Sequence, residues 1–185
     1  IAFFQSMGGF GIPFKTLTGN HDAPQGTWRP LYRNVPIDDR TAIDVVVKAC
    51  PDIVYCVDWT WEHNIMCIPF VKDEVGWLEE LQNWLERAEE EGERPDILLM
   101  HQDTKQQIHN GHCLISETEI REHFQYVFNG HIHRMETNEN FITAGSLLQQ
   151  KPGDMTNTEK GVWTVEWKDD DIVVEFLPYH GGPKF

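Results

Sequence analysis

The chain has 185 residues, 40% of them hydrophobic and 24% charged, a composition that excludes both a membrane-spanning and an intrinsically disordered protein. Thirty acidic residues against 15 basic ones give a net charge of −15, which repels nucleic acid at long range and argues against a generic DNA-binding protein. At about 100 to 200 residues per domain, the length predicts a single domain over residues 1–185.

The first predicted strand covers residues 14–18 and ends at the polar tetrapeptide Gly19-Asn20-His21-Asp22. Residues 23–40 are rich in proline and polar side chains, so we expect a loop on the substrate side. Three weaker patterns follow, namely a helix over 41–49 and strands over 53–57 and 64–70 around a turn at 58–63. The last segment could equally be an irregular hairpin. Open α/β sheets build their sites beyond the carboxyl ends of strands, and the tetrapeptide has that position.

Residues 73–91 form the clearest predicted helix, because apolar residues recur at helical spacing and Gly92 and Pro95 follow its end. The apolar run at 96–100 predicts a buried strand that delivers His101 at its end. A helix is predicted over 117–124, with a capping box of Ser116 and Glu119, and a strand over 126–128. The β-prone runs that follow cover 141–144, 161–167 and 172–179, and residues 169–171 join the last two as a hairpin.

Three polar clusters each follow a predicted strand: the tetrapeptide 19–22, His101, and the segment Gly130-His131-Ile132-His133. A sheet could bring them to one edge, where imidazoles and a carboxamide would suit a borderline divalent metal such as Mn, Fe or Zn. Taken singly, the tetrapeptide could be an ordinary turn and His101 a core or surface histidine. The pair His131 and His133 is a stronger signal, because residues i and i+2 of an extended segment share one face.

The order of these clusters resembles the last three of five motifs in the calcineurin-like metallophosphoesterase family. The resemblance implies an α/β fold, a four-layer αββα sandwich with mixed sheets. It also implies that the complete enzyme binds two divalent metal ions, which activate a hydroxide for attack on phosphorus. It implies that Asn20, His101 and His131 ligate one metal and that His133 ligates the other. It also implies that His21 contacts the phosphate and donates a proton to the leaving oxygen.

Within that family, three segments and the Asp22 of the tetrapeptide resemble the SbcD-like DNA repair exonucleases; the segments are 129–134, 142–146 and 161–165. This resemblance implies an exonuclease or endonuclease that cuts DNA phosphodiesters, with manganese as the expected metal and iron or zinc as alternatives. It also implies an SbcC-like coiled-coil ATPase as a partner. The chain departs from that branch at Phe185, where a capping domain and an ATPase-binding segment usually follow.

Two motifs of the family do not occur in residues 1–18: the D-x-H after its first strand, and the G-D whose Asp bridges both metals. The chain also begins at Ile1, in what resembles the last turns of an apolar helix. We therefore expect residues 1–185 to be the C-terminal portion of a longer domain, with N-terminal strand-helix units absent. We expect this portion alone to be inactive or weakly active.

The acidic charge is unevenly distributed, since residues 73–96 hold ten acids against two basic residues, whereas residues 15–48 hold four acids against five. The near-neutral charge of residues 15–48 is compatible with a nucleic acid substrate, and Trp28 and Tyr32 are candidates to stack on its bases. Two alternatives stay open. One is a protein or small-molecule phosphomonoesterase with the same metals, and the other is a degenerate scaffold that binds a partner through the acidic helix.

The four cysteines include no Cys-x-x-Cys pair and do not form a disulfide framework pattern, which favours a reducing compartment. The first residues lack the basic region and cleavage site of a signal peptide. We therefore predict a cytoplasmic protein with no membrane partner.

Overall fold

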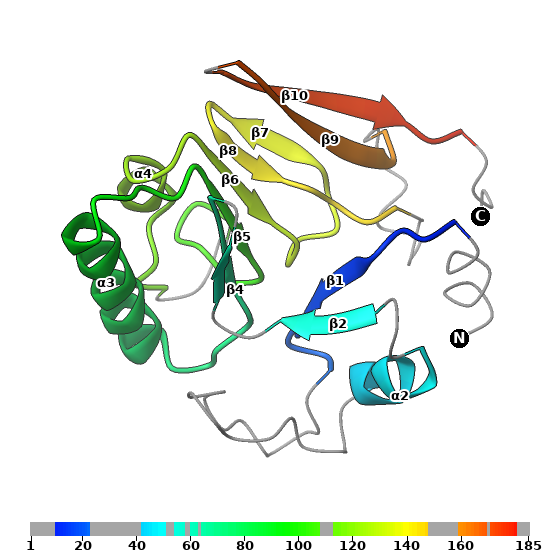
Figure 1. The fold of residues 1–185 in the computed structure, drawn as a ribbon, viewed down its shortest axis with the longest axis horizontal. Coiled ribbons are helices and arrows are strands. Elements are labelled where there is room, and N and C mark those ends of the chain that lie inside the picture. The colour runs from blue at the N-terminus through cyan, green and yellow to red at the C-terminus, as the bar shows by residue number, and fades with distance from the viewer. Residues whose placement is uncertain are drawn as a thin grey trace. The chain divides into compact units, whose positions relative to one another are not determined.

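In the computed structural model, helices and strands are mixed over residues 14–129, and the described elements after residue 129 are all strands (Figure 1). The residues that the structure describes are 10–22, 42–50, 54–57, 60–62, 64–107, 113–147, 159–169 and 171–180. The predicted helix end before residue 10 and the loop with Trp28 and Tyr32 lie outside them. The chain divides into two compact units: unit 1 is Ile1–Pro95 with Met100–Gln102, and unit 2 is Asp96–Leu99 with Asp103–Phe185. The single-domain organisation stays a prediction.

Unit 1 begins with a strand-helix-strand arrangement. Strand β1 (Phe14–Leu17) pairs in parallel with β2 (Val54–Val57), and helix α2 (Ala42–Ala49) lies between them in sequence. These three elements match their predicted positions within two residues. A parallel pair needs a crossover connection of this kind, because a tight turn can only join antiparallel strands.

Unit 1 continues with a hairpin of β3 (Thr60–Glu62) and β4 (Ile65–Ile68). The prediction of a turn over residues 58–63 is wrong for Thr60–Glu62, which are paired strand residues. The turn is displaced to Asn64, whose φ of 63° is left-handed. Asparagine tolerates that conformation, which tight hairpin turns require.

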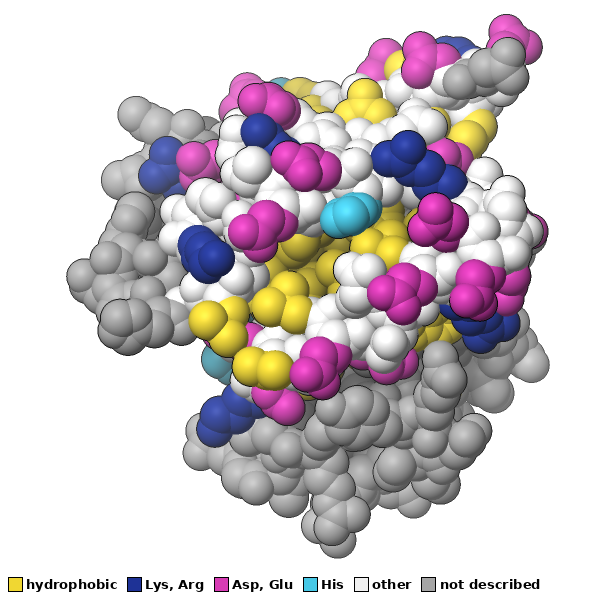
Figure 2. Space-filling view, turned by 90° about the vertical axis from the view of Figure 1, so that its left-hand side faces the viewer, with side chains coloured by type: hydrophobic (Ala, Val, Ile, Leu, Met, Phe, Trp, Pro, Cys, Tyr) yellow, Lys and Arg dark blue, Asp and Glu magenta, His cyan; other side chains and the backbone are white. Residues whose placement is uncertain are grey.

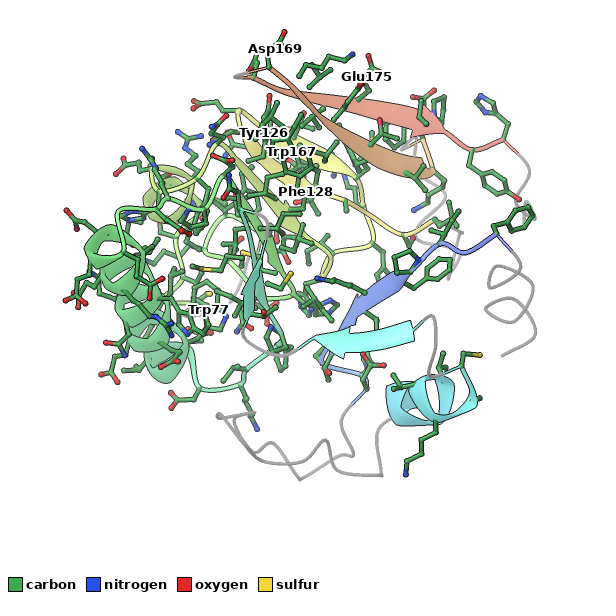
Figure 3. The ribbon with its side chains drawn as sticks, in the orientation of Figure 1. Trp77, Tyr126, Phe128, Trp167, Asp169 and Glu175 are labelled. Atoms are coloured by element: carbon green, nitrogen blue, oxygen red, sulfur yellow. The ribbon has the colours of Figure 1, made fainter. Side chains whose placement is uncertain are left out.

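Helix α3 (Glu74–Glu90) confirms the clearest sequence prediction. Its buried face is formed by Trp77, Leu81 and Ala88, and the Trp77 side chain, labelled beside the helix in Figure 3, is fully buried. Near its end, the hydrogen-bonded Glu91 carboxylate raises the pKa of the Arg87 guanidinium. Figure 2 shows the side of the molecule that carries α3, where acidic side chains are interspersed with Lys and Arg. The acidic face of this helix is therefore solvated.

In unit 2 the central strands follow the order β5-β6-β8-β7. They are β5 (Ile97–Met100, without Met100 itself), β6 (Tyr126–Asn129), β8 (Phe141–Thr143) and β7 (Glu136–Asn138). Strand β6 pairs in parallel with β8, and β8 pairs antiparallel with β7. Parallel and antiparallel pairs thus occur in both units, which confirms the predicted α/β class with mixed sheets.

Helix α4 (Glu117–Arg121) is shorter than the predicted helix over 117–124. Ser116 takes the N-cap position, but in the part of the chain that the structure describes its side chain makes no capping hydrogen bond. The predicted capping box is therefore wrong. Instead, the backbone N–H of Glu117 donates to Gln106 Oε1 at 3.1 Å, so the cap comes from the preceding loop.

The hairpin of β9 (Gly161–Lys168) and β10 (Asp171–Pro178) confirms the predicted antiparallel end of the chain. Its apolar face carries Trp163, whose ring lies 5.1 Å from Phe176 and 6.4 Å from Phe128 of β6, centroid to centroid. Phe128 and Tyr126 lie below the hairpin in Figure 3, and Asp169 is at its turn. The aromatic stack packs the hairpin against the central strands of unit 2.

Glycine at position 161 allows the backbones of β9 and β10 to approach closely where β9 begins. A Cβ at Gly161 would lie 2.2 Å from the carbonyl oxygen of Leu177 on the paired strand. Backbone atoms cannot yield to such a contact, so no other residue fits without moving the strands. The position of Lys160, directly before Gly161, is fixed by the same pairing.

Among the described helices, none combines the length and apolar character that a bilayer crossing requires. This finding agrees with the composition.

We predict that Trp77→Ala lowers the free energy of unfolding by about 3–5 kcal/mol, because it leaves a cavity where a fully buried indole was. Val75→Ala, on the exposed side of the same helix, is the matched control and should change it by less than about 0.5 kcal/mol. Chemical denaturation of both variants measures the difference. Equal effects would show that the buried face of α3 is wrongly assigned.

Candidate functional site

The tetrapeptide Gly19–Asp22 follows β1 directly and forms a closed turn in unit 1. The N–H of Asp22 donates to Gly19 O at 3.1 Å, and the N–H of Gly19 donates to Asp22 Oδ2 at 2.7 Å. These two bonds bury Gly19 and leave His21 exposed. The predicted position of this polar cluster, just beyond the first strand, is confirmed.

The side chain of Asn20 meets His101, although 81 positions separate them in sequence. His101 Nε2 and Asn20 Oδ1 are 3.1 Å apart, and the Nε2–H tautomer donates to the carboxamide oxygen. A Cβ at Gly19 would lie 2.9 Å from His101 Cε1, so glycine is what lets the imidazole approach the turn. Two residues predicted to act together are therefore in direct contact within unit 1.

Buried backbone bonds fix the approach of His101. The N–H of Phe70 donates to Thr18 O at 2.9 Å, and the Phe70 ring stands edge-on to the His101 ring. The Gln102 carboxamide, 1% exposed, accepts from the N–H of Val71 at 3.2 Å and donates to its carbonyl at 2.8 Å. Hydrogen bonds thus hold Thr18, just before the tetrapeptide, and Gln102, just after His101, and these bonds cost free energy to break.

In unit 2, His131 pairs with a carboxylate that the sequence prediction missed. Asp103 Oδ1 is 2.7 Å from His131 Nε2, and the side chains are 33% and 13% exposed. A short, partly buried contact of this kind is a strong hydrogen bond. The only sequence signal for Asp103 was its place two residues after His101, in the same loop beyond β5.

The buried carboxamide of Asn129 organises the segment that carries His131. Asn129 is fully buried at the end of β6, and its Oδ1 accepts from the N–H of His131 at 3.2 Å. Its Nδ2 donates to Gln107 Oε1 at 3.2 Å, and Gln107 Nε2 donates in turn to the Thr143 hydroxyl. Both polar atoms of Asn129 are thereby used, and the backbone of His131 is held to the strand end.

Lys160 holds the backbone of His133, the other predicted ligand in unit 2. Lys160 Nζ donates to His133 O at 2.9 Å and to Ser146 Oγ at 3.0 Å. The N–H of Ser146 donates to the same carbonyl at 3.1 Å. One ammonium group from the start of β9 therefore joins the histidine segment to the segment after β8.

These side chains are of the types that a divalent metal prefers. Among the described residues, no group of three or more His, Cys, Asp or Glu side chains gathers in a metal-binding arrangement. Within unit 1, however, a carboxamide oxygen and an imidazole nitrogen face each other at 3.1 Å. Within unit 2, an imidazole and a carboxylate do so at 2.7 Å. Nitrogen and oxygen donors of these types fit Mn, Fe or Zn.

One comparison with known proteins identifies the type of domain. The family model described as calcineurin-like phosphoesterase matches residues 1–135, which include the tetrapeptide 19–22, His101, His131 and His133. No curated protein matches the chain.

We predict that Lys160→Met lowers the free energy of unfolding by about 1.5–3 kcal/mol, because it removes charged hydrogen bonds to two partly buried oxygens. The control is Lys168→Met on the same hairpin, where the lost partner is the exposed Glu166 and the cost should stay below about 1 kcal/mol. Urea unfolding of both variants tests this. A smaller effect at Lys160 than at Lys168 would contradict the assigned role.

Proposed function

The chain belongs to the calcineurin-like phosphoesterase family. On that basis we propose that it functions as a DNA phosphodiesterase, an exonuclease or endonuclease of DNA repair. The family membership itself makes this a metal-dependent phosphoesterase domain. The observation that carries the proposal is the contact between Asn20 and His101, because it joins two polar clusters that lie far apart in sequence and have metal-binding donors.

The residues proposed to hold divalent metals are Asn20, His101, His131 and His133. When bound, the metals would supply a water-derived nucleophile at neutral pH and neutralise phosphate charge. We propose manganese, with iron or zinc as alternatives, since imidazole and oxygen donors accept all three.

His21 is the proposed proton donor. Its exposed position on the turn next to Asn20 lets the imidazole contact a phosphate and protonate the leaving oxygen. The bonds between Gly19 and Asp22 keep that turn closed, so the chain presents His21 at a fixed point beside the Asn20 carboxamide. The geometry favours an imidazole that acts on substrate over one that holds the fold together.

DNA as the substrate is supported by the resemblance to SbcD-like nucleases and by the near-neutral balance of residues 15–48. Ten of the thirty acidic residues lie on α3 and its flanks, where acidic side chains face solvent among basic ones (Figure 2). By the same resemblance we propose a coiled-coil ATPase of the SbcC type as partner and the cytoplasm as location. A phosphomonoesterase and a non-catalytic scaffold are the competing functions that the first experiment separates.

We predict that the full-length protein with Mn²⁺ hydrolyses a single-stranded oligonucleotide with a kcat/KM at least about tenfold above that for a phosphopeptide. The reason is that an oligonucleotide offers a phosphate at every nucleotide, so several contacts contribute to its binding. Parallel turnover assays at one salt concentration measure this. The reverse preference would establish a phosphomonoesterase. No hydrolysis of either substrate, together with no rise in Tm on adding Mn²⁺, would favour the scaffold.

We predict that His21→Asn lowers kcat about 10²- to 10⁴-fold while the affinity for Mn²⁺ changes less than about twofold, because the residue donates a proton and does not ligate metal. The matched control is His180→Asn, an exposed histidine after β10 that should leave both quantities unchanged. Steady-state kinetics and calorimetric titration with Mn²⁺ provide the two readouts. Parallel loss of turnover and metal affinity would make His21 a ligand instead.

A further inference from the structure

We propose that Asp103 is a positioning residue: it binds the Nε2–H of His131 and so directs the Nδ1 lone pair of the same ring toward a divalent metal. The inference deepens the proposed function, on which the ligand role of His131 rests. The family comparison assigns no role to Asp103. It is a carboxylate brought to a candidate metal ligand by the fold of unit 2.

The geometry defines the tautomer of His131. A carboxylate only accepts hydrogen bonds, so the contact of 2.7 Å between Asp103 Oδ1 and His131 Nε2 requires a hydrogen on Nε2. A neutral imidazole carries one N–H, and Nδ1 then keeps its lone pair, which is the form that binds metal. The ring is 13% exposed, so water competes little for the same nitrogen.

Asp103 is presented from a fixed loop. The next residue, Thr104, is fully buried and donates its hydroxyl to Glu117 Oε1 at 2.7 Å. The N–H of Lys105 donates to Ile115 O at 2.8 Å, and Cys113 Sγ lies 3.4 Å from Asp103 O. Because the chain is held at Asp103 and at the two residues that follow it, the carboxylate meets the imidazole without a large loss of loop entropy.

The same loop holds His131 a second time. Gln107, four residues after Asp103, binds the Asn129 carboxamide that accepts from the His131 N–H. The loop over residues 103–107 therefore fixes the imidazole through Asp103 and the backbone through Gln107. A carboxylate that only formed a surface ion pair would need neither this anchoring nor a partly buried partner.

The test uses the full chain and three variants. Asp103→Ala removes the acceptor, Asp103→Asn keeps an acceptor oxygen of the same reach, and Asp171→Ala removes an exposed carboxylate of β10 that bonds the backbone of Ile172. Long-range ¹H–¹⁵N spectra of the imidazoles, at a pH where they are neutral, report the tautomer. The His131 signal is assigned from its absence in His131→Gln. Calorimetric titration with Zn²⁺ alone measures metal affinity.

We expect His131 to be the Nε2–H tautomer in the wild type, in Asp103→Asn and in Asp171→Ala, and to become a mixture in Asp103→Ala. Zn²⁺ affinity should fall about 10- to 100-fold in Asp103→Ala and be largely restored in Asp103→Asn. Should the Ala variant fail to fold, as judged by its Tm, the His131 tautomer of the wild type decides, because the contact with Asp103 requires the Nε2–H form.

Three results would overturn the proposal: an Nδ1–H tautomer in the wild type, an unchanged tautomer in a folded Asp103→Ala, or equal Zn²⁺ titrations in the wild type and that variant. Lost Zn²⁺ binding with an unchanged tautomer would make Asp103 a ligand in its own right. Absent DNA hydrolysis with the expected tautomer and affinity changes would count against the proposed substrate and leave the role of Asp103 standing.

Discussion

The buried carboxamide of Gln102 is the constraint on which the geometry of unit 1 depends. It occupies both the N–H and the carbonyl of Val71, so it replaces a strand neighbour for that residue. Two hydrogen bonds to one residue fix the orientation of the Gln102 side chain as well as its distance from Val71. His101 is the residue directly before Gln102. With Phe70 bound to Thr18 at the end of the first strand, the imidazole has one approach to the Asn20 turn. The contact between the His101 imidazole and the Asn20 turn is thus supported by the uncharged side chain of the neighbouring Gln102.

Unit 2 uses a second amide in the same way. Asn129 is buried at the end of β6, where its carboxamide bonds Gln107 on one side and the His131 N–H on the other. Buried amides suit this purpose because they both donate and accept, and they carry no charge that would need a counterion. Charged groups then act at the margin of each arrangement, as Lys160 does at His133.

The parts of the fold that the sequence predicted are those with a repeating apolar pattern. Helix α3 and strand β5 bury continuous apolar faces, so their types could be read from periodicity. Strand β7 has three exposed residues and no such pattern, and it exists because β8 offers it a partner. The contact of Asn20 with His101 was predictable from motif order. The Asp103–His131 contact was not, because nothing local to either residue indicates the loop that joins them.

The Asn129-Gly130 dipeptide has a chemical consequence of its own. In unfolded chains, glycine leaves its backbone nitrogen free to attack the preceding carboxamide carbon, and the asparagine slowly becomes aspartate or isoaspartate. In the native fold Asn129 is fully buried with both side-chain polar atoms bonded, which blocks that attack. An aspartate there could no longer donate to Gln107 Oε1, and a fresh charge would stay buried. Because this reaction is slow, its rate depends on the fraction of time that unit 2 spends open, so the stability of unit 2 protects the segment that carries His131.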